Sequence, residues 1–432
     1  MDNKQNHITT SVKATAPDIL FFCASVVLFL IVHLTNDQIP RLLRFAGHIS
    51  LLASLVNITG DLLPYVPLIK AALFIVAIGI LFTPVIYDIR SNYTTSKSHI
   101  LRTTGIAIIT AVFLGILAFS PENFSLGQGY AERSLAPFAQ DQDWFSKRLL
   151  MPAIAYFLYF RGDWLYFVFS NLLFFLFLGL TYHWLKENTQ IKVWQFVSLC
   201  TCSFAMYQYQ MPGYPDVLTF TFFILVMYPG FSQRSKLGFL VLALITHEAS
   251  LFIGILLACR FLDKNNRIKY FIVLILYGAI WAFIYHFGAD MILASYEVKH
   301  MSGLEWILYK PGMEGLGIFI AFKAVWLLIT IGMIMSWRSK QFGEAGFILA
   351  CVLTGILMTV LGTDTSRLMG FAFSSALVAN KSIRSNFAKT QANRLLSIIF
   401  IINLLIPSFN VGLNIGIFFS PGLYQLLFSW IH

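Results

Sequence analysis

The sequence predicts an all-α polytopic membrane protein, with about eleven transmembrane helices in one integral membrane domain over residues 1–432. Three observations predict this class. Apolar residues make up 58% of the chain and charged residues only 12%, whereas a soluble domain carries about a quarter charged residues. Uninterrupted apolar stretches of about 18 residues or more recur, and each could cross a hydrocarbon layer of about 30 Å. Lys and Arg gather in alternate short loops, which is typical of cytoplasmic loops.

The order of the spans follows from hydropathy and charge. A polar tail leads into a full-length apolar span without a small-residue cleavage site, so we expect a retained first helix and a cytoplasmic N-terminus. The inner segments then hold 19 of the 30 Lys and Arg but only 6 of the 20 acids, which predicts this orientation. The expected spans lie near 18–35, 64–87, 103–119, 165–185, 194–210, 217–232, 270–287, 316–336, 346–362, 368–380 and 395–417.

A large outer loop, residues 120–164, separates the third and fourth spans. Its apolar part, 149–160, is too short to cross a bilayer, so we expect an interfacial helix there. Three acids of this loop are expected just outside the bilayer and are the candidate catalytic carboxylates. They are Glu132, Asp141 and Asp143, and Arg148 follows as a candidate substrate ligand.

A further apolar run, 237–259, carries His247 and Glu248 at its centre. Basic residues flank it on both sides, so a single crossing would reverse the side of every later loop. We therefore predict a re-entrant helical hairpin that enters from the cytoplasmic side and turns at His247 and Glu248. An ionisable pair inside a membrane is a functional-site hypothesis by default. The alternative is a pair that only hydrogen-bonds a neighbouring helix and holds the turn.

Two more polar clusters fall in outer loops, MPGYPDV with Asp216 and GTDTSRLMG with Asp364 and Arg367. Carboxylates and arginines from separate parts of the chain are thus expected at one face, although exposed loops are also polar without a function. One chemistry that needs such a set is sugar transfer from a lipid-phosphate donor. A carboxylate can take the proton of an attacking hydroxyl, while Arg or His neutralises charge on the departing phosphate.

Other kinds of site find little support in the sequence. The chain contains neither a nucleotide-binding glycine pattern nor a basic and aromatic array that would indicate nucleic-acid binding. The cysteines lie in or beside apolar spans, so no disulfide framework or zinc site is predicted. Asp141 and Asp143 could chelate a divalent metal, but a D-x-D spacing is common by chance. No metal or cofactor is therefore assigned.

The motifs GQGYAERSLAPF, DQDWFSKRLLMPAIAYFL, SNLLFFLFLGLTYHWL, GYPDVLTF and LGFLVLALITHEASLFIGILL follow one another between Gly127 and Leu257. In this order they resemble the bacterial GT-C-type polytopic glycosyltransferases, particularly the mannosyltransferase-like group. The resemblance implies a GT-C-like fold in the lipid bilayer of a bacterial cytoplasmic (inner) membrane, with the site facing the periplasm or exterior. It also implies a polyprenyl-phosphate-sugar donor and a glycan, lipid or protein acceptor. By position, the matching polar sites are Arg148, Asp216, and His247 with Glu248.

One position departs from that group, whose members commonly carry Asp-Gly where this chain has Leu126 before Gly127. Either Glu132, Asp141 or Asp143 replaces that base, or the chain has lost transferase activity. Two other functions fit the same features. A transporter or flippase of a lipid-linked or polyanionic intermediate would bind its substrate at the hairpin, and a polysaccharide polymerase or ligase would share the outer-face site.

Overall fold

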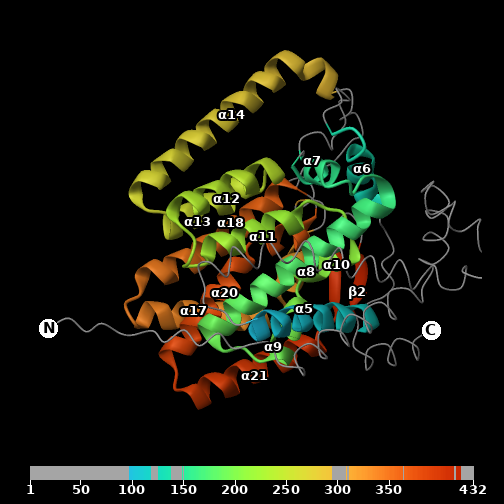
Figure 1. Cartoon of the computed structure of the whole chain (residues 1–432). Coiled ribbons are helices and arrows are strands. Elements are labelled where there is room, and N and C mark those ends of the chain that lie inside the picture. The colour runs from blue at the N-terminus through green and yellow to red at the C-terminus, as the bar shows by residue number, and fades with distance from the viewer. Residues whose placement is uncertain are drawn as a thin grey trace, which may run out of the picture. The chain divides into compact units, whose positions relative to one another are not determined.

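The computed structural model describes residues 97–117, 125–137, 148, 150–293, 308, 311–362, 364–412 and 415–419 (Figure 1). The chain divides into two compact units, Met1–Val112 and Phe113–His432. Apart from α5, which extends over this boundary, the features described below belong to the second unit. The described residues are mostly helical, as the sequence predicts. The predicted spans 18–35 and 64–87 lie outside the described residues, as do Asp141 and Asp143.

Long apolar runs without proline form long helices, such as α8 with 28 residues and α18 with 20. The described elements, in chain order, are α5 (Lys97–Leu117), α6 (Ser125–Arg133), α7 (Leu150–Phe157), α8 (Gly162–Thr189), α9 (Val193–Cys200), α10 (Ser203–Gln210), α11 (Asp216–Met227), α12 (Gln233–Thr246), α13 (Ser250–Phe261), α14 (Lys264–Leu293), α16 (Pro311–Phe322), α17 (Val325–Arg338), α18 (Phe342–Leu361), α19 (Thr365–Gly370), α20 (Phe373–Asn386), α21 (Lys389–Leu405), β1 (Ser408–Val411) and β2 (Ile415–Phe419).

Two described helices are long and apolar enough to cross a membrane, Gly162–Thr189 and Phe342–Val360. The pair α16 and α17 passes the same test when taken together, but it is bent by 74° at the break between its halves. These helices coincide with the predicted spans 165–185, 346–362 and 316–336. The predicted spans 18–35, 64–87, 103–119 and 270–287 stay a prediction, and the others are compared with the structure below.

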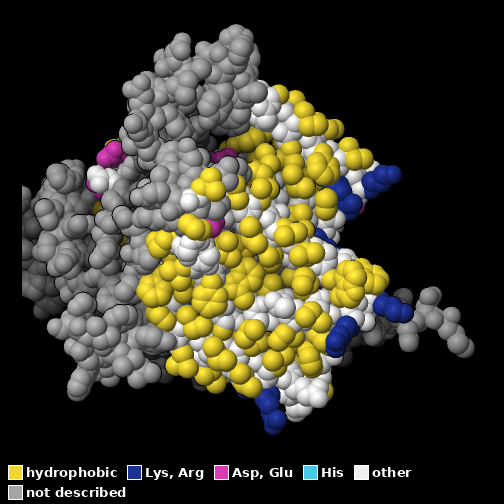
Figure 2. Space-filling view, turned by 180° about the vertical axis from the view of Figure 1, so that it is seen from behind, with side chains coloured by type: hydrophobic (Ala, Val, Ile, Leu, Met, Phe, Trp, Pro, Cys, Tyr) yellow, Lys and Arg dark blue, Asp and Glu magenta, His cyan; other side chains and the backbone are white. Residues whose placement is uncertain are grey.

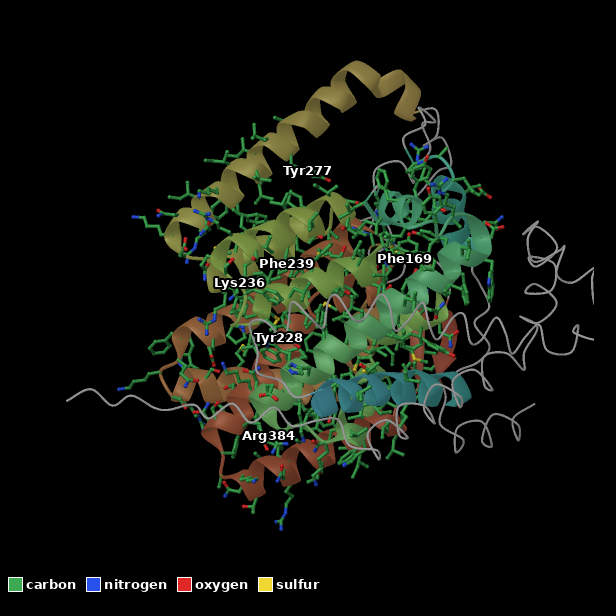
Figure 3. All side chains as sticks on the ribbon, in the orientation of Figure 1. Phe169, Tyr228, Lys236, Phe239, Tyr277 and Arg384 are labelled. Atoms are coloured by element: carbon green, nitrogen blue, oxygen red, sulfur yellow. The ribbon has the colours of Figure 1, made fainter. Side chains whose placement is uncertain are left out.

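Helix α11 lies at the centre of the described fold, and all its residues are buried. It packs against α8 and α12 (Figure 1). Phe239 of α12 stacks on Phe222 of α11 and meets Phe231 of the connecting turn (Figure 3). On another side, the ring of Phe220 lies 5.1 Å from that of Phe373 in α20. Each such aromatic ring contributes about 1.5–3 kcal/mol when fully buried, so this core fixes the start of α11.

Helices α17 and α20 approach each other closely at Gly332. A Cβ atom on Gly332 would lie 2.6 Å from the Cα of Ala379. The hydroxyl of Ser382 donates to the Gly332 carbonyl at 3.0 Å and lies 2.6 Å from the hydroxyl of Ser336. Small residues and serine hydroxyls therefore form this interface, a composition typical of helix packing in membranes.

The run predicted as a hairpin forms two helices, α12 and α13, which turn back on each other at His247–Ala249. The backbone N–H of Asp263, just after α13, donates to the side chain of Gln233, the first residue of α12, at 2.9 Å. The turn has its own hydrogen bonds, because Ser250 Oγ donates to the Ala243 carbonyl at 2.8 Å. The chain thus reverses at the predicted residues, and entry into a membrane from one side stays a prediction.

The apolar part of the outer loop forms the short helix α7. It ends in a turn where Tyr159 adopts a left-handed backbone with φ 63°. The guanidinium of Arg161 lies 3.8 Å from the ring centroid of Tyr156 and 4.5 Å from that of Tyr159, while Phe157 and Tyr159 are exposed. Exposed aromatic rings beside an arginine are typical of a membrane interface, where the sequence predicts this helix.

The all-α prediction is wrong near the C-terminal end of the described chain. The predicted span 395–417 ends as α21 at Leu405 and continues into the antiparallel ribbon β1–β2, in which Val411 pairs with Ile415. Pro407 explains the helix end, because proline lacks a backbone N–H and disfavours helical backbone in the residue before it.

Three other predicted spans are divided or shortened. The span 368–380 is interrupted at Phe371 and Ala372, between α19 and α20. The span 194–210 is interrupted at Thr201 between α9 and α10. The span 217–232 becomes α11, which ends before Tyr228. Tyr228 is extended, with ψ 127°, as expected for a residue that precedes a proline, here Pro229.

Three interruptions meet at the buried side chain of Lys323, which lies at the break between α16 and α17. Its Nζ donates to Thr201 Oγ1 at 2.7 Å, to the Ile406 carbonyl at 3.1 Å and to Ser408 Oγ at 3.1 Å. Ser408 Oγ in turn donates to the Thr201 carbonyl at 2.5 Å. This Lys323 node supplies hydrogen bonds where helical backbone pairing ends, as irregular backbone inside an apolar core requires.

Candidate functional site

Six of the residues that the sequence selects lie in one continuous group of charged side chains, although they come from four separate segments of the chain. Each member lies within ion-pair distance of another. We call this group the polar cluster: Arg148, Asp216, His247, Glu248, Asp364 and Arg367.

Asp216 is the centre of the polar cluster and begins α11, with an exposed fraction of 0%. The turn before it requires Gly213, whose φ is 95° and whose N–H donates to Ser170 of α8 at 2.6 Å. Asp216 Oδ1 lies 3.1 Å from His247 Nε2, and Oδ2 lies 3.1 Å from Arg367 Nε. Neither contact has the alignment of a hydrogen bond. The helix N-terminus and these neighbours therefore compensate the carboxylate mainly through charge and dipole interactions.

His247 joins the hairpin turn to α11. Its Nδ1 accepts the backbone N–H of Ala249 at 3.0 Å, so this nitrogen carries no proton. We therefore assign the ring proton to Nε2, which faces Asp216, and the imidazole is neutral. Nε2 lies 3.1 Å from Asp216 Oδ1 without the alignment of a hydrogen bond. This arrangement makes His247 a link between the hairpin turn and α11.

Arg148 donates hydrogen bonds to the hairpin turn and to α6. Its Nε and Nη2 donate to the two oxygens of Glu248 at 3.0 and 2.5 Å, and Nη1 donates to the hydroxyl of Tyr130 at 3.0 Å. Burial works against the charge of Arg148, but the hydrogen-bonded carboxylate of Glu248 favours it, and the pKa of Arg148 is raised. Burial raises the pKa of Tyr130 despite the nearby guanidinium. Arg148 is therefore charged and Tyr130 neutral at any physiological pH.

Arg367 bridges two carboxylates on the other side of the cluster, because its Nη1 also donates to Asp364 Oδ2 at 2.8 Å. The ring of Tyr214 lies between the two arginines, 4.5 Å from the guanidinium of Arg367 and 5.7 Å from that of Arg148. Such cation–π contacts favour charged guanidinium groups that are removed from water. Tyr214 thus joins the two halves of the cluster.

The parts of the cluster that solvent reaches are acidic. The exposed side-chain fractions are 47% for Glu248 and 36% for Asp364, whereas both arginines are buried. With a neutral His247, the two arginines and three carboxylates leave a formal charge of −1. A molecule that approaches therefore meets hydrogen-bond acceptors first, with the positive charges behind them.

The other predicted catalytic acids lie elsewhere or are not described. Glu132 is on the exposed side of α6, where its Oε1 accepts a hydrogen bond from Gln128 at 3.2 Å. Asp141 and Asp143 fall outside the described residues. Among the residues that are described, no three His, Cys, Asp or Glu side chains are placed to hold a metal ion.

Sequence reasoning missed three tyrosines that pack beside the polar cluster, Tyr130, Tyr207 and Tyr214. The ring of Tyr214 packs edge-on against those of Tyr130 and Tyr207, at 5.4 and 6.1 Å between centroids. Two of them lie inside motifs that the sequence already marks, GQGYAERS and GYPD. Their position next to the selected charges was the available signal.

Comparisons with protein families, curated proteins and solved structures find no match to this chain. The resemblance to GT-C-type glycosyltransferases therefore stays a prediction. The functional argument depends on the residues of the polar cluster and on their geometry.

Proposed function

We propose that this protein is a membrane glycosyltransferase that moves a sugar from a polyprenyl-phosphate-linked donor to an acceptor at the non-cytoplasmic face. The observation that supports this proposal most is the polar cluster itself. Four segments, far apart in an apolar chain, bring two arginines and three carboxylates together around Tyr214. Charges buried in this way are costly unless they are paired, which makes their convergence a candidate site for function.

The order of groups from solvent inwards suits a donor with a sugar and a phosphate. Glu248 and Asp364 are half-exposed and can accept hydrogen bonds from sugar hydroxyls or from an acceptor hydroxyl. Arg148 and Arg367 lie behind them and would stabilise charge on the departing phosphate. A phosphate would compete with Glu248 for Arg148, because Glu248 engages two of its nitrogens.

Several carboxylates are candidates for the general base. Among the described residues, Glu248 and Asp364 lie at the opening of the cluster, whereas Glu132 lies on the exposed side of α6. Asp141 and Asp143 stay candidates from the outer loop. Asp216 is fully buried between Arg367 and His247, so its role is to hold the cluster together.

The test is turnover of defined donors by the purified protein in lipid nanodiscs. Polyprenyl-phosphate hexoses and pentoses with a radiolabelled sugar are incubated with a membrane glycan and lipid fraction, and release of polyprenyl phosphate is measured. We expect turnover of at least one donor, and loss of that turnover in Asp364→Asn. Arg260→Ala removes an exposed ion pair with Glu344 and is the matched control.

A transporter or flippase is the second candidate, and the broken helix favours it. The 74° bend between α16 and α17 places a buried lysine inside a candidate membrane span. Broken helices with buried polar groups are typical of secondary transporters. Movement of a labelled lipid intermediate across liposomes by the wild type, without turnover of any donor, would favour this function over transfer. A polymerase or ligase would instead show transfer between glycans.

A further inference from the structure

Three consecutive residues of the short helix α19 are held by three different elements. Thr365 Oγ1 donates to Glu314 Oε2 of α16 at 2.6 Å. Ser366 Oγ accepts the backbone N–H of Val411 in β1 at 3.0 Å. Arg367 then reaches Asp216 of α11. The contacts of Thr365 and Ser366 therefore hold the part of α19 from which the Arg367 side chain extends.

Helix α16 has no space to move against Thr365. A Cβ atom on Gly317, one turn after Glu314, would lie 2.6 Å from Thr365 Cγ2 and 3.3 Å from Val411 Cβ. Glycine is required there because the side chain of Thr365 fills the place of a Cβ atom. A displacement of α16 would thus be transmitted to α19.

Glu314 is a buried acid that the sequence analysis did not select. Its exposed fraction is 6%, and its Oε1 atom is buried without a hydrogen-bond partner among the described residues. A buried acceptor without a partner costs about 1–3 kcal/mol, so a residue with this arrangement needs an explanation. The hydrogen bond to Thr365 is the contact that connects it to the polar cluster.

We propose that Glu314 is a positioning residue of the candidate site and acts on Arg367 through Thr365. Its carboxylate fixes the rotation of α19, and this rotation places the Arg367 guanidinium between Asp216, Asp364 and the ring of Tyr214. The proposal assigns Glu314 no contact with substrate. Its effect on catalysis rests on the proposed glycosyl transfer, but its effect on α19 does not.

The first test measures geometry without any substrate. Amide hydrogen exchange is followed for peptides from α19 and, as an internal reference, from α20 in the full-length protein. Thr365→Val keeps the size of threonine but removes the hydroxyl, and Thr365→Ser keeps the hydroxyl. We expect at least about tenfold faster exchange in α19 for Thr365→Val, and wild-type exchange for Thr365→Ser. Unchanged exchange in Thr365→Val would overturn the proposal.

The second test uses transfer activity. Thr365→Val and Glu314→Met should lower kcat/KM about tenfold, whereas Thr365→Ser and Glu314→Gln, which retain the donor and the acceptor, should stay within about twofold. In an Arg367→Lys background, Thr365→Val should have little further effect because both changes act on the same guanidinium. If the losses of kcat/KM from Arg367→Lys and Thr365→Val were additive in the double variant, the positioning role of Glu314 and Thr365 would be contradicted. Absence of transfer by the wild type would instead contradict the proposed function, and the exchange experiment alone would then decide the role of Glu314.

Discussion

At the scale of single residues, the polar cluster shows how a chain with few charges can bury several of them together. Each arginine contacts carboxylate oxygens and an aromatic ring, and the neutral His247 joins the two sides without adding charge. Breaking a fully buried pair costs about 3–5 kcal/mol because the remaining charge loses its partner. Variants of the cluster should therefore separate into those that affect stability and those that affect chemistry.

Glu248→Gln tests the half-exposed side of the cluster. The pair with Arg148 is 47% exposed on the glutamate side, so its loss should cost less than a fully buried pair would. We expect normal expression, a Tm within a few degrees of wild type and loss of most transfer of the lipid-linked sugar. Wild-type transfer by a folded Glu248→Gln protein would assign the residue to the structure of the turn.

Arg367 and Asp216 test the buried side. Arg367→Ala should lower Tm strongly, because Asp216 has an exposed fraction of 0% and would lose a positive partner. The charge-balanced double variant Asp216→Asn with Arg367→Met should recover much of the Tm without recovering transfer. Thermal melting in detergent and donor turnover measure the two effects. Recovery of both would show that the pair only supports the fold.

The charged members of this site could be predicted from sequence, whereas the tyrosines could not. In a chain with 12% charged residues, an acid or arginine in a tight outer loop is informative, and Asp216, Asp364 and Arg367 were found in this way. The chain has 18 tyrosines and 42 phenylalanines, so a ring such as Tyr214 carries no comparable signal. Glu314 was not selected from the sequence because it lies inside an otherwise apolar helix. Its hydrogen-bond partner Thr365 is distant in sequence.

At the scale of elements, the apolar runs were recognised but their interruptions were not. Hydropathy averages over a window, and the break at Thr201 has no proline or glycine in LCTCSF to mark it. That break depends on tertiary partners instead, because Asn403 Nδ2 donates to the Ser198 carbonyl at 2.8 Å and Lys323 binds the Thr201 hydroxyl. The hairpin turn was predictable because charge on both sides and a central polar pair point to the same reversal.

Close helix packing makes a prediction at this scale. Gly332→Ala should lower stability by about 1–3 kcal/mol, because its new Cβ would lie 2.6 Å from the Ala379 backbone and α17 would have to move away from α20. Gly346→Ala is the matched control in α18, where an added Cβ meets no atom within 4 Å, and it should be neutral or slightly stabilising. Thermal melting of both proteins in the same detergent decides the matter. Equal Tm values for Gly332→Ala and Gly346→Ala would show that α17 and α20 can accommodate the added Cβ atom without loss of stability.

At the scale of the whole second unit, segments that are predicted to lie on the same side of the membrane contact one another. Among the predicted inner segments, Asp263 bonds Gln233, and Arg260 lies 3.2 Å from Glu344. The predicted outer segments meet in the polar cluster. Figure 2 shows a broad hydrophobic face with Lys and Arg side chains along its edge, a distribution that suits a surface in contact with lipid. The two-sided topology itself stays a prediction.

Cysteine labelling tests that topology directly. In a background without the native cysteines, Tyr159→Cys should react with an impermeant maleimide from outside intact cells, and Asn265→Cys should react only after the membrane is opened. Both positions are exposed, so failure to react reports the side and not burial. Labelling of Asn265→Cys from outside would contradict the re-entrant hairpin.

The Lys323 node also constrains the timing of assembly during synthesis. The ribosome delivers Thr201 early, Lys323 in the middle and Ser408 late, and the bond from Ser408 to the Thr201 carbonyl spans 207 residues of sequence. Helices α16 and α17, with 12 and 14 residues, are each shorter than the roughly 20 residues that a single crossing needs. A nascent chain that has not reached Ile406 would therefore hold a lysine amine without two of its final oxygen partners. Completion of this part of the fold must therefore await translation through Ser408.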